Sequence, residues 1–178
     1  DAQWSFHCQT RSSASFRHPG HLDSSAGPAK RVNIRRGREY NPPMKLVVGG
    51  DHAGFPLKGP VIELLRSWGH DVQDLGTHSE EPVDFPDIAH RVCEEIRAHR
   101  AERGILVCGT GVGAAIAGNK HPGIRAAVCH DTYSARQSVE HDDVNLLCLG
   151  AWLVGRKTVE EVLRAWLEAR FSTAEDFR

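Results

Sequence analysis

The stretch ILVCGTGVGAAIAGNK (residues 105–120) passes from a strand through a glycine-rich loop into a helix. A short, continuous apolar run such as ILVC is typical of a strand in a parallel sheet that is covered on both faces. Gly109, Gly111 and Gly113 allow the backbone to approach a ligand closely and to adopt positive φ. Their N–H groups and the N-terminus of the following helix can form an anion-binding concavity. The stretch therefore predicts one unit of an α/β fold with a binding loop at the end of a strand.

Strand and helix patterns alternate in the same way along the chain from Met44 onward. Apolar runs predict five strands, and amphipathic or Ala-rich segments predict the helices between them. The predicted strands cover 46–49, 71–75, 104–109, 123–130 and 145–150. Four helices begin near Lys58, Asp87, Asp131 and Thr158, and the Ala-rich piece after the third strand is a short helix. This alternation predicts an α/β fold, a Rossmann-like three-layer α/β/α sandwich around a five-stranded parallel sheet.

Two strand orders are common in such sheets, 3-2-1-4-5 and 2-1-3-4-5, and ligands bind where the order reverses. In the order 2-1-3-4-5 the first and third strands are neighbours. Their exit loops, GGDHAG (49–54) and CGTGVG (108–113), are the two most unusual loops of the chain. We therefore predict the order 2-1-3-4-5, with a site where these loops meet.

Residues 1–43 differ in composition from the remainder. They are rich in Ser, Arg, Gly and Pro and carry a net charge of +4, so the remainder carries −5 of the total of −1. Such a composition buries too little apolar surface to offset the entropy of ordering. The only methionine, Met44, begins MKLVVGGDHAG, which reads as a normal protein start. We expect a disordered upstream extension over 1–43 and one domain over 44–178, with a basic nucleic-acid-binding arm as the alternative for the extension.

The composition also limits the location and the partners of the chain. Hydrophobic residues make up 40% and charged residues 25%, and no apolar run approaches the about 20 residues that span a membrane. The net charge of −1 argues against nucleic acid as the main partner. Five scattered cysteines without a CxxC pair predict reduced thiols in a cytoplasmic protein, rather than a disulfide framework or a structural zinc site.

The glycine loop matches no common nucleotide or phosphatase signature. A dinucleotide fingerprint places GxGxxG directly after the first strand, whereas these glycines follow the third. A Walker loop requires GK[ST], and a CxxxxxR phosphatase loop fails because Ala114 is the sixth residue after Cys108. A nucleotide-binding module stays as an alternative that the glycine positions disfavour.

Polar side chains follow the first and third strands directly. Cys108 stands where the strand ends, and a helix N-terminus lowers the pKa of a nearby thiol, which suits a nucleophile or a base. The alternative is that Cys108 only ends a buried strand. Asp51 and His52 follow the first strand, where they can serve the same site or be a capping carboxylate and a surface histidine.

His141 lies in VEHDDVN (139–145), between the end of a helix and the start of the fifth strand. This position belongs to the amino edge of the sheet, opposite the edge that carries Cys108. A functional His141 would therefore serve the site of a neighbouring subunit. The alternative is a histidine that complements the dipole at a helix C-terminus.

Five ordered motifs resemble the type B ribose-5-phosphate isomerases and the related LacAB sugar-phosphate isomerases. They are GGDHAGFPLK, DFPDIA, ILVCGTGVGAAIAGNK, GIRAAVCHDTYSARQSVEHDDVN and LGAWLVG, and the resemblance runs from Met44 to about Phe171. It implies a Rossmann-like homodimer with active sites shared between subunits, and it leaves open whether dimers pair into tetramers. It also implies aldose–ketose isomerisation of a phosphorylated sugar through a cis-enediolate, without a cofactor or a metal.

The resemblance implies roles for individual residues. Cys108 matches the family's thiol base, and Thr110 with the N–H groups of the loop would stabilise the enediolate oxygen. His141 matches the histidine that opens the sugar ring. Ala114 stands where some relatives carry a glutamate base, which supports the thiol branch. The implied substrate-binding positions are Asp51, His52, Gly109, Gly111, Gly113 and Asp142.

Several positions depart from the family pattern. Trp152 stands where many members have an arginine linked to phosphate binding, and of the usual arginine-rich C-terminal extension only Arg178 remains. Phe85 replaces a common tyrosine, and Asp142 replaces a frequent asparagine. These departures leave the sugar open among tetrose, pentose and hexose phosphates. They also give an alternative of another class, a non-catalytic sugar-phosphate-binding paralogue.

Overall fold

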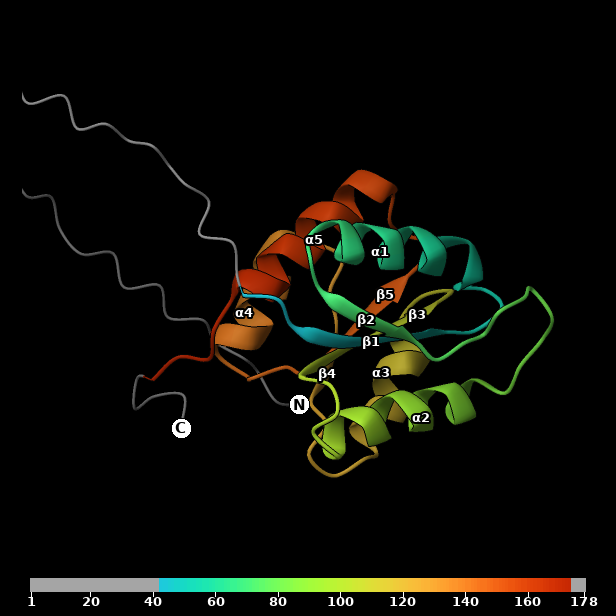
Figure 1. Cartoon of the computed structure of the whole chain (residues 1–178), viewed down its shortest axis with the longest axis horizontal. Helices are drawn as coiled ribbons and strands as arrows, with labels where there is room; N and C mark the ends of the chain where they lie inside the picture. The colour runs from blue at the N-terminus through green and yellow to red at the C-terminus, as the bar shows by residue number, and fades with distance from the viewer. Residues whose placement is uncertain (1–41, 174–178) are drawn as a thin grey trace, which may run out of the picture. The chain divides into compact units, whose positions relative to one another are not determined.

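The computed structural model describes residues 42–173, in which five parallel strands alternate with five helices (Figure 1). The strands are β1 (Lys45–Gly50), β2 (Asp71–Asp74), β3 (Arg103–Cys108), β4 (Ala126–Val128) and β5 (Leu146–Gly150). The helices are α1 (Phe55–Ser67), α2 (Phe85–Arg97), α3 (Val112–Asn119), α4 (Thr132–Glu140) and α5 (Arg156–Glu168). The predicted α/β class is confirmed. The extension expected over 1–43 lies, apart from its last two residues, outside the described residues.

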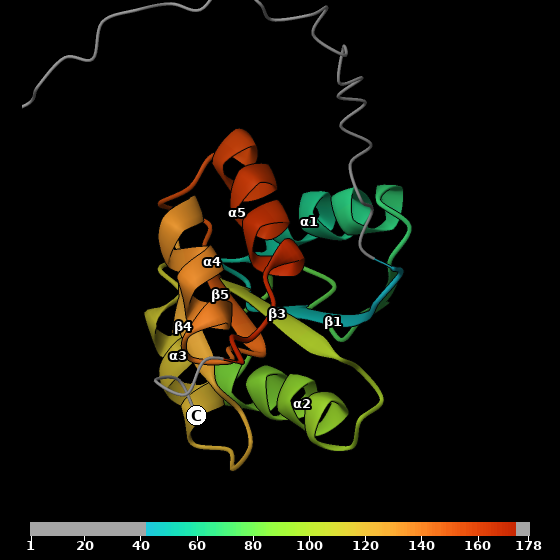
Figure 2. The same ribbon diagram turned by 90° about the vertical axis from the view of Figure 1, so that its left-hand side faces the viewer.

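The helices cover both faces of the sheet, as the two views in Figures 1 and 2 show. Successive strand residues point to opposite faces. Val48, Ile105 and Leu147 pack in one apolar cluster with residues of α1, α4 and α5. Val47 and Leu106 pack in the other cluster with residues of α2 and α3. The predicted three-layer sandwich is thus confirmed.

The strand order is 2-1-3-5-4, which corrects the predicted position of the last two strands. All five residues of β5 are buried, whereas the three residues of β4 are only partly buried. A strand buried on both faces belongs inside the sheet, and the short Ala-Ala-Val strand lies at the edge. The prediction that β1 and β3 are neighbours is confirmed, because the two strands pair in parallel with Val48 opposite Ile105.

Helix α1 begins at Phe55, three residues before the predicted start near Lys58. The prediction placed Pro60 in the first turn, but Pro56 occupies that turn and Pro60 lies inside the helix. The first turn forms early because the N–H groups of Leu57 and Lys58 both donate to the carbonyl of Gly54, each at 3.0 Å. The helix therefore starts directly at the carboxyl edge of β1.

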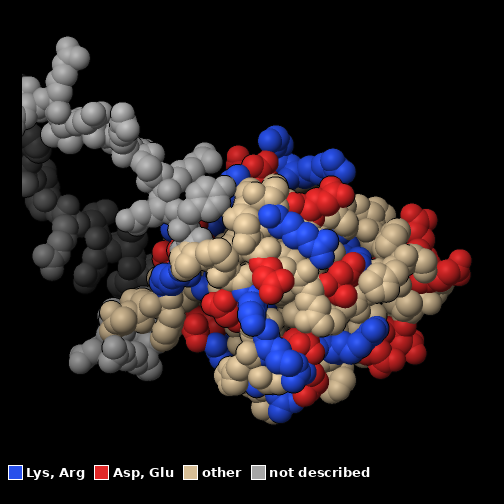
Figure 3. All heavy atoms as spheres, in the orientation of Figure 1, with Lys and Arg blue, Asp and Glu red and all other residues tan. Residues whose placement is uncertain are grey.

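Charged side chains of both signs are interspersed over the face shown in Figure 3. This distribution agrees with the near balance of 22 basic against 23 acidic residues in the whole sequence. Within residues 42–173, no helix combines the length and the apolar character that crossing a bilayer requires.

Candidate active site

The exit loops of β1 and β3 meet at the carboxyl edge of the sheet. The N–H of Asp51 donates to the carbonyl of Val107 at 3.2 Å. A Cβ placed on Gly54 would lie only 2.0 Å from that carbonyl oxygen, so the two loops touch through their backbones. The predicted meeting of these loops is thus present, and it requires glycine at position 54.

Cys108 ends β3 at the mouth of the glycine loop. Cys108 is buried, with 7% of its surface exposed, and Sγ accepts a hydrogen bond of 3.0 Å from the N–H of Gly111. Gly111 has φ +83°, a left-handed conformation that favours glycine, and it directly precedes α3. The turn thereby holds the sulfur beside the start of a helix.

The three other thiols that the structure describes are buried as well. Burial raises the pKa of Cys93 to about 11. Burial also raises the pKa values of Cys129 and Cys148. Among the described cysteines, Cys108 is the one in a glycine loop at the carboxyl edge.

Backbone donors surround the same loop. The first N–H groups of an α-helix have no acceptor within the helix, and in α3 these begin at Val112. The N–H of Val112 donates to Oγ1 of Thr110 at 3.4 Å, and Thr110 is exposed. Gly113, in the first turn of α3, is also exposed, and a Cβ there would meet no other group within 4 Å. The loop and the helix start can therefore present N–H and hydroxyl donors to an anionic oxygen.

The exit segment of β5 forms a further wall of the site. The N–H of Trp152 donates to the carbonyl of Gly109 at 3.1 Å. A Cβ on Gly109 would lie 2.7 Å from the indole ring of Trp152, so this contact requires glycine. Gly150 lies equally close to the backbone of Thr110, at 2.8 Å from an added Cβ. Trp152 itself is 73% exposed, and its ring forms a broad apolar surface beside the loop.

His130, which was not among the residues predicted for the site, also lies at this edge. Its Nε2 accepts a hydrogen bond of 3.1 Å from the N–H of Gly150. The acceptor role places the proton of the neutral ring on Nδ1. The position directly after a strand, like that of Asp51, was the signal that could have found it.

The first exit loop contributes Asp51 and His52 with different exposure. Asp51 is half-buried, and its Oδ1 accepts a hydrogen bond of 2.8 Å from the N–H of Gly54. His52 is exposed at the top of the loop. The Asp51 carboxylate thus supports the turn before α1 without capping that helix, and both side chains lie at the edge that carries Cys108.

His141 and Asp142 lie at the opposite, amino edge of the sheet. His141 caps the C-terminus of α4, where its N–H donates to the carbonyl of Gln137 at 2.9 Å. Its Nδ1 lies 3.1 Å from Nε2 of Gln137, and Asp142 is exposed. Within one chain the fold therefore brings together Asp51, Cys108 and the glycine loop, but not His141.

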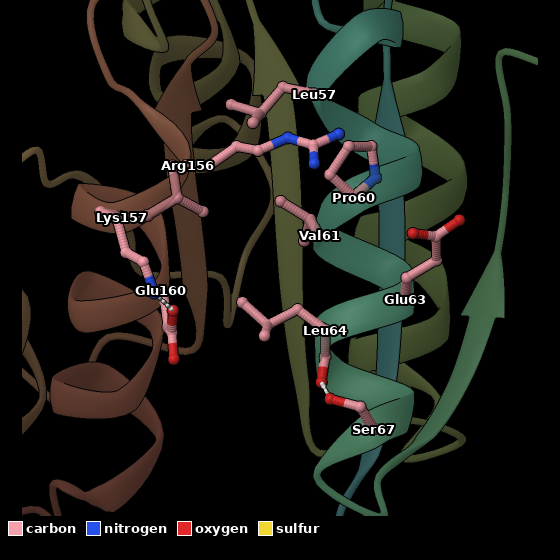
Figure 4. Close-up of a pocket in the computed structure, with 10 residues that line it drawn as sticks. Leu57, Pro60, Val61, Glu63, Leu64, Ser67, Arg156, Lys157 and Glu160 are labelled. Carbon is pink, nitrogen blue, oxygen red and sulfur yellow. Dashed lines mark hydrogen bonds and ion pairs between the residues drawn. The ribbon is translucent and has the colours of Figure 1, made fainter.

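Two cavities lie away from the loops at the carboxyl edge. One, of about 420 Å³, is a groove between α1 and α5 whose walls include Leu57, Leu64 and Arg156 (Figure 4). The other, of about 500 Å³, lies at the amino edge and is lined by residues such as Arg103 and Asp143. Neither of these two cavities is lined by the glycine loop.

Comparison with known proteins identifies the family of the chain. The family model described as Ribose/Galactose Isomerase matches residues 46–178. Ribose-5-phosphate isomerase B of Escherichia coli (strain K12) is 42% identical over 127 residues, which cover 71% of this chain and 85% of that protein. D-erythrulose-4-phosphate isomerase of Pectobacterium atrosepticum is 38% identical over 130 residues, which cover 72% of this chain and 85% of that protein.

Solved structures give the same result. Ribose-5-phosphate isomerase B of Clostridium thermocellum superposes with a TM-score of 0.73 at 44% identity, over 75% of this chain and 90% of that one. Type B ribose 5-phosphate isomerase of Trypanosoma brucei superposes with a TM-score of 0.71 at 38% identity, over 75% of this chain and 91% of that one. The chain therefore belongs to the ribose/galactose isomerase family.

Proposed function

We propose that this protein interconverts the aldose and ketose forms of a phosphorylated sugar, with Cys108 as the base and without a cofactor. The named activities of its relatives support a sugar-phosphate isomerase of this kind. The observation that carries the proposal is the position of the Cys108 sulfur, 3.0 Å from the N–H of Gly111 at the mouth of an anion-binding loop. A base next to donors for an oxyanion is the arrangement that enediolate chemistry requires.

The proposed reaction moves one proton between two carbon atoms of the open-chain sugar. The Cys108 thiolate removes the proton from C2, and the electron pair of that bond forms the C1–C2 double bond of a cis-enediolate. The same sulfur then returns the proton to C1, while the hydroxyl proton on O2 moves to O1 and the carbonyl forms at C2. Oxidation at C2 balances reduction at C1, so no external electron carrier is required.

The glycine loop would stabilise the intermediate. Negative charge develops on an oxygen of the enediolate as the proton leaves C2. Thr110 and the N–H groups at the start of α3 lie at the same edge as the sulfur and can donate to that oxygen. Donors that are fixed before the reaction need no reorganisation when the charge appears.

An apolar patch at the carboxyl edge supports a homodimer with shared sites. Five large hydrophobic side chains are between 52% and 73% exposed on α3, at the start of α4 and after β5. Patches of this kind on soluble proteins mark interaction surfaces. The patch consists of Val112, Ile116, Tyr133, Trp152 and Leu153.

A second copy on this patch would also complete the site. The edge strand β4 and the flanking helices α3 and α4 form this side of the sheet. Two copies paired antiparallel along this side place each amino edge beside the other's carboxyl edge. His141 of the partner subunit would then reach the loop of Cys108, where it could open the sugar ring. Pairing of such dimers into tetramers is compatible with this arrangement.

The direct test is a coupled assay of the full chain with a panel of tetrose, pentose and hexose phosphates. We expect saturable isomerisation of at least one aldose–ketose pair without added metal or nucleotide. The preferred sugar is the one with the highest kcat/KM, since the loss of an arginine at Trp152 leaves that choice open. Saturable binding across the panel without any turnover would instead favour the non-catalytic paralogue.

A further inference from the structure

Two histidines and a glutamate gather on the α2–α3 face, away from the proposed active site. His90 and Glu94 stand one turn apart on α2, and His121 lies in the turn that follows α3. One ligand atom of each side chain lies within 4.8 Å of the other two. The two imidazole rings are 5.3 Å apart between centroids and tilted by 39°. The cluster therefore brings three metal-ligating groups from two segments to one place on the surface.

We propose that His90, Glu94 and His121 bind a divalent transition-metal ion of the Zn²⁺ class. Two imidazoles and one carboxylate are a common ligand set for such ions, with water in the fourth position. The i, i+4 spacing of His90 and Glu94 directs both side chains from one face of the helix, as in helical zinc motifs. Alkaline-earth ions are excluded by chemistry, because they prefer sets of oxygen ligands.

The geometry needs only a small adjustment to hold the ion. Bonds of about 2.0–2.1 Å to a tetrahedral ion place ligand atoms about 3.3 Å apart. His90 is exposed, while Glu94 and His121 are half-buried, so rotations of these side chains can close the remaining gaps. The backbone of α2 and of the turn after α3 can stay in place.

Arg97 is the neighbouring charge that opposes binding. Its Nη1 donates to Oε1 of Glu94. A carboxylate has a second oxygen, so Glu94 can face the ion while it keeps this partner. The Arg97 guanidinium nevertheless repels a cation, and its ion pair competes with the metal ion for the Glu94 carboxylate. Removing that charge therefore tightens binding, an effect that no purely structural role of the cluster predicts.

Binding would tie α2 to the turn between α3 and β4. An ion that binds the folded chain and not the unfolded one stabilises it by mass action. At about 100 times the Kd, we expect the midpoint of thermal unfolding to rise by roughly 5–10 °C. Isomerase activity stays unchanged, because Cys108 and its loop lie at the other edge of the sheet.

The test titrates the full chain with Zn²⁺ by calorimetry and with Co²⁺ by absorption spectroscopy. The double variant His90→Ala/His121→Ala should lose about tenfold or more in affinity, and Arg97→Gln should gain affinity. His78→Ala removes an exposed histidine outside the cluster and serves as the matched control. Circular dichroism confirms that each variant is folded.

Three outcomes would overturn the proposal. Unchanged zinc affinity in the double variant would assign the ion to other residues. A thiolate-to-cobalt charge-transfer band would assign it to a cysteine. Weaker binding in Arg97→Gln would contradict the placement of the ion beside Glu94.

Discussion

The three glycines of the loop after β3 have different surroundings. Gly111 has a backbone φ of +83°, and Gly109 lies against the ring of Trp152. A Cβ added to Gly113 would contact no other group of the chain within 4 Å. The first two glycines are therefore explained by the fold itself. The exposed Gly113 is not, and the proposed function gives it a reason. A bare backbone there lets the substrate approach the N–H groups of α3 closely.

Replacing Gly113 by alanine should separate stability from activity. Alanine in α3 should raise the free energy of unfolding by up to about 1 kcal/mol. It should also lower kcat/KM, because the new methyl group enters the space of the substrate oxygen. Urea unfolding and steady-state kinetics measure the two effects, and an equally active variant would show that no substrate approaches this backbone.

Gly111→Ala is the matched comparison in the same loop. Here the alanine Cβ meets Val128 at 3.2 Å in a left-handed conformation, so the variant should lose stability as well as activity. Opposite signs of the stability change at positions 111 and 113 are the expected signature.

Part of this residue-scale description could be predicted from the sequence. The meeting of Asp51 with the β3 exit and the positive φ among the loop glycines follow from strand order and from glycine spacing. The contacts of His130 and Trp152 do not, because both depend on β5 lying between β3 and β4. The loops after β1 and β3 indicated that these two strands are neighbours, but no comparable pattern indicated the order of β4 and β5.

At the scale of elements, an ion pair ties α1 to β2. Lys58 is 2% exposed, and its Nζ lies 2.5 Å and 2.6 Å from the two carboxylate oxygens of Asp74. Oδ1 of Asp74 also accepts from the N–H of Gly76 at 3.0 Å. These contacts hold the start of the loop that leads from β2 to α2. From the sequence, Lys58 was predicted only to lie near the start of a helix.

Asp74→Asn should destabilise the fold strongly. The variant leaves the buried Lys58 ammonium without a counter-charge, which costs about 3 kcal/mol. Urea unfolding at neutral pH measures this loss. Glu160→Gln removes a carboxylate that pairs with Lys157 and Arg164. Neither cation is buried as Lys58 is, so this variant should leave the unfolding midpoint near the wild-type value. An equal loss of unfolding free energy in the two variants would contradict the claim that burial of Lys58 makes its ion pair important for stability.

The same pair predicts how stability depends on pH. Burial opposes ionisation of Asp74, but the hydrogen bonds from Lys58 and Gly76 and the charges of Lys58 and His78 outweigh it, and the pKa of Asp74 lies below its usual value. A lowered carboxyl pKa contributes stability above the unfolded value of about 3.9, and that contribution disappears as the pH falls through the native value. The difference in the free energy of unfolding between wild type and Asp74→Asn should therefore shrink as the pH falls from about 4 through the native pKa of Asp74. A constant difference down to the lowest pH would contradict the assignment.

The elements themselves could be predicted well, but two of their details could not. Every strand and helix appears near its predicted range, because each has a clear apolar period. The start of α1 was misplaced because Pro60 suggested a first turn that Pro56 occupies. The predicted order of β4 and β5 was wrong because the order depends on which strand is buried on both faces. The residues LLCLG of β5 are all buried, whereas the residues AAV of β4 are only partly buried.

At the scale of the whole molecule, the separation of Cys108 and His141 is the main constraint. Helix α4 starts after the carboxyl end of β4 and ends at His141, before β5 begins at the amino edge. The sequence predicted this separation from the alternation of elements alone. It could not place the partner subunit, because an interface depends on side chains from several distant segments.

Mixing two inactive variants tests the shared site. In a heterodimer of Cys108→Ala and His141→Ala chains, one of the two sites combines the intact cysteine with the intact histidine. Random pairing should therefore restore about a quarter of the wild-type activity, since half the dimers are mixed and each has one good site. Activity after co-refolding measures the restoration.

The matched control combines Cys108→Ala with Thr110→Ala. Both residues belong to the same loop, so every site in this mixture keeps a defect and no activity should return. Restoration in this control, or none in the first mixture, would contradict a site built from Cys108 and the partner's His141.

The measurement that tests the central proposal most directly is the conversion of a sugar phosphate by Cys108→Ala in heavy water, followed by proton NMR. We expect wild type and Cys93→Ala to form product, because burial keeps Cys93 as an inert thiol with a pKa of about 11. Cys108→Ala should bind the sugar with similar affinity but convert it at least about 100-fold more slowly. Conversion by Cys108→Ala at the wild-type rate would contradict the role of this thiol as the base.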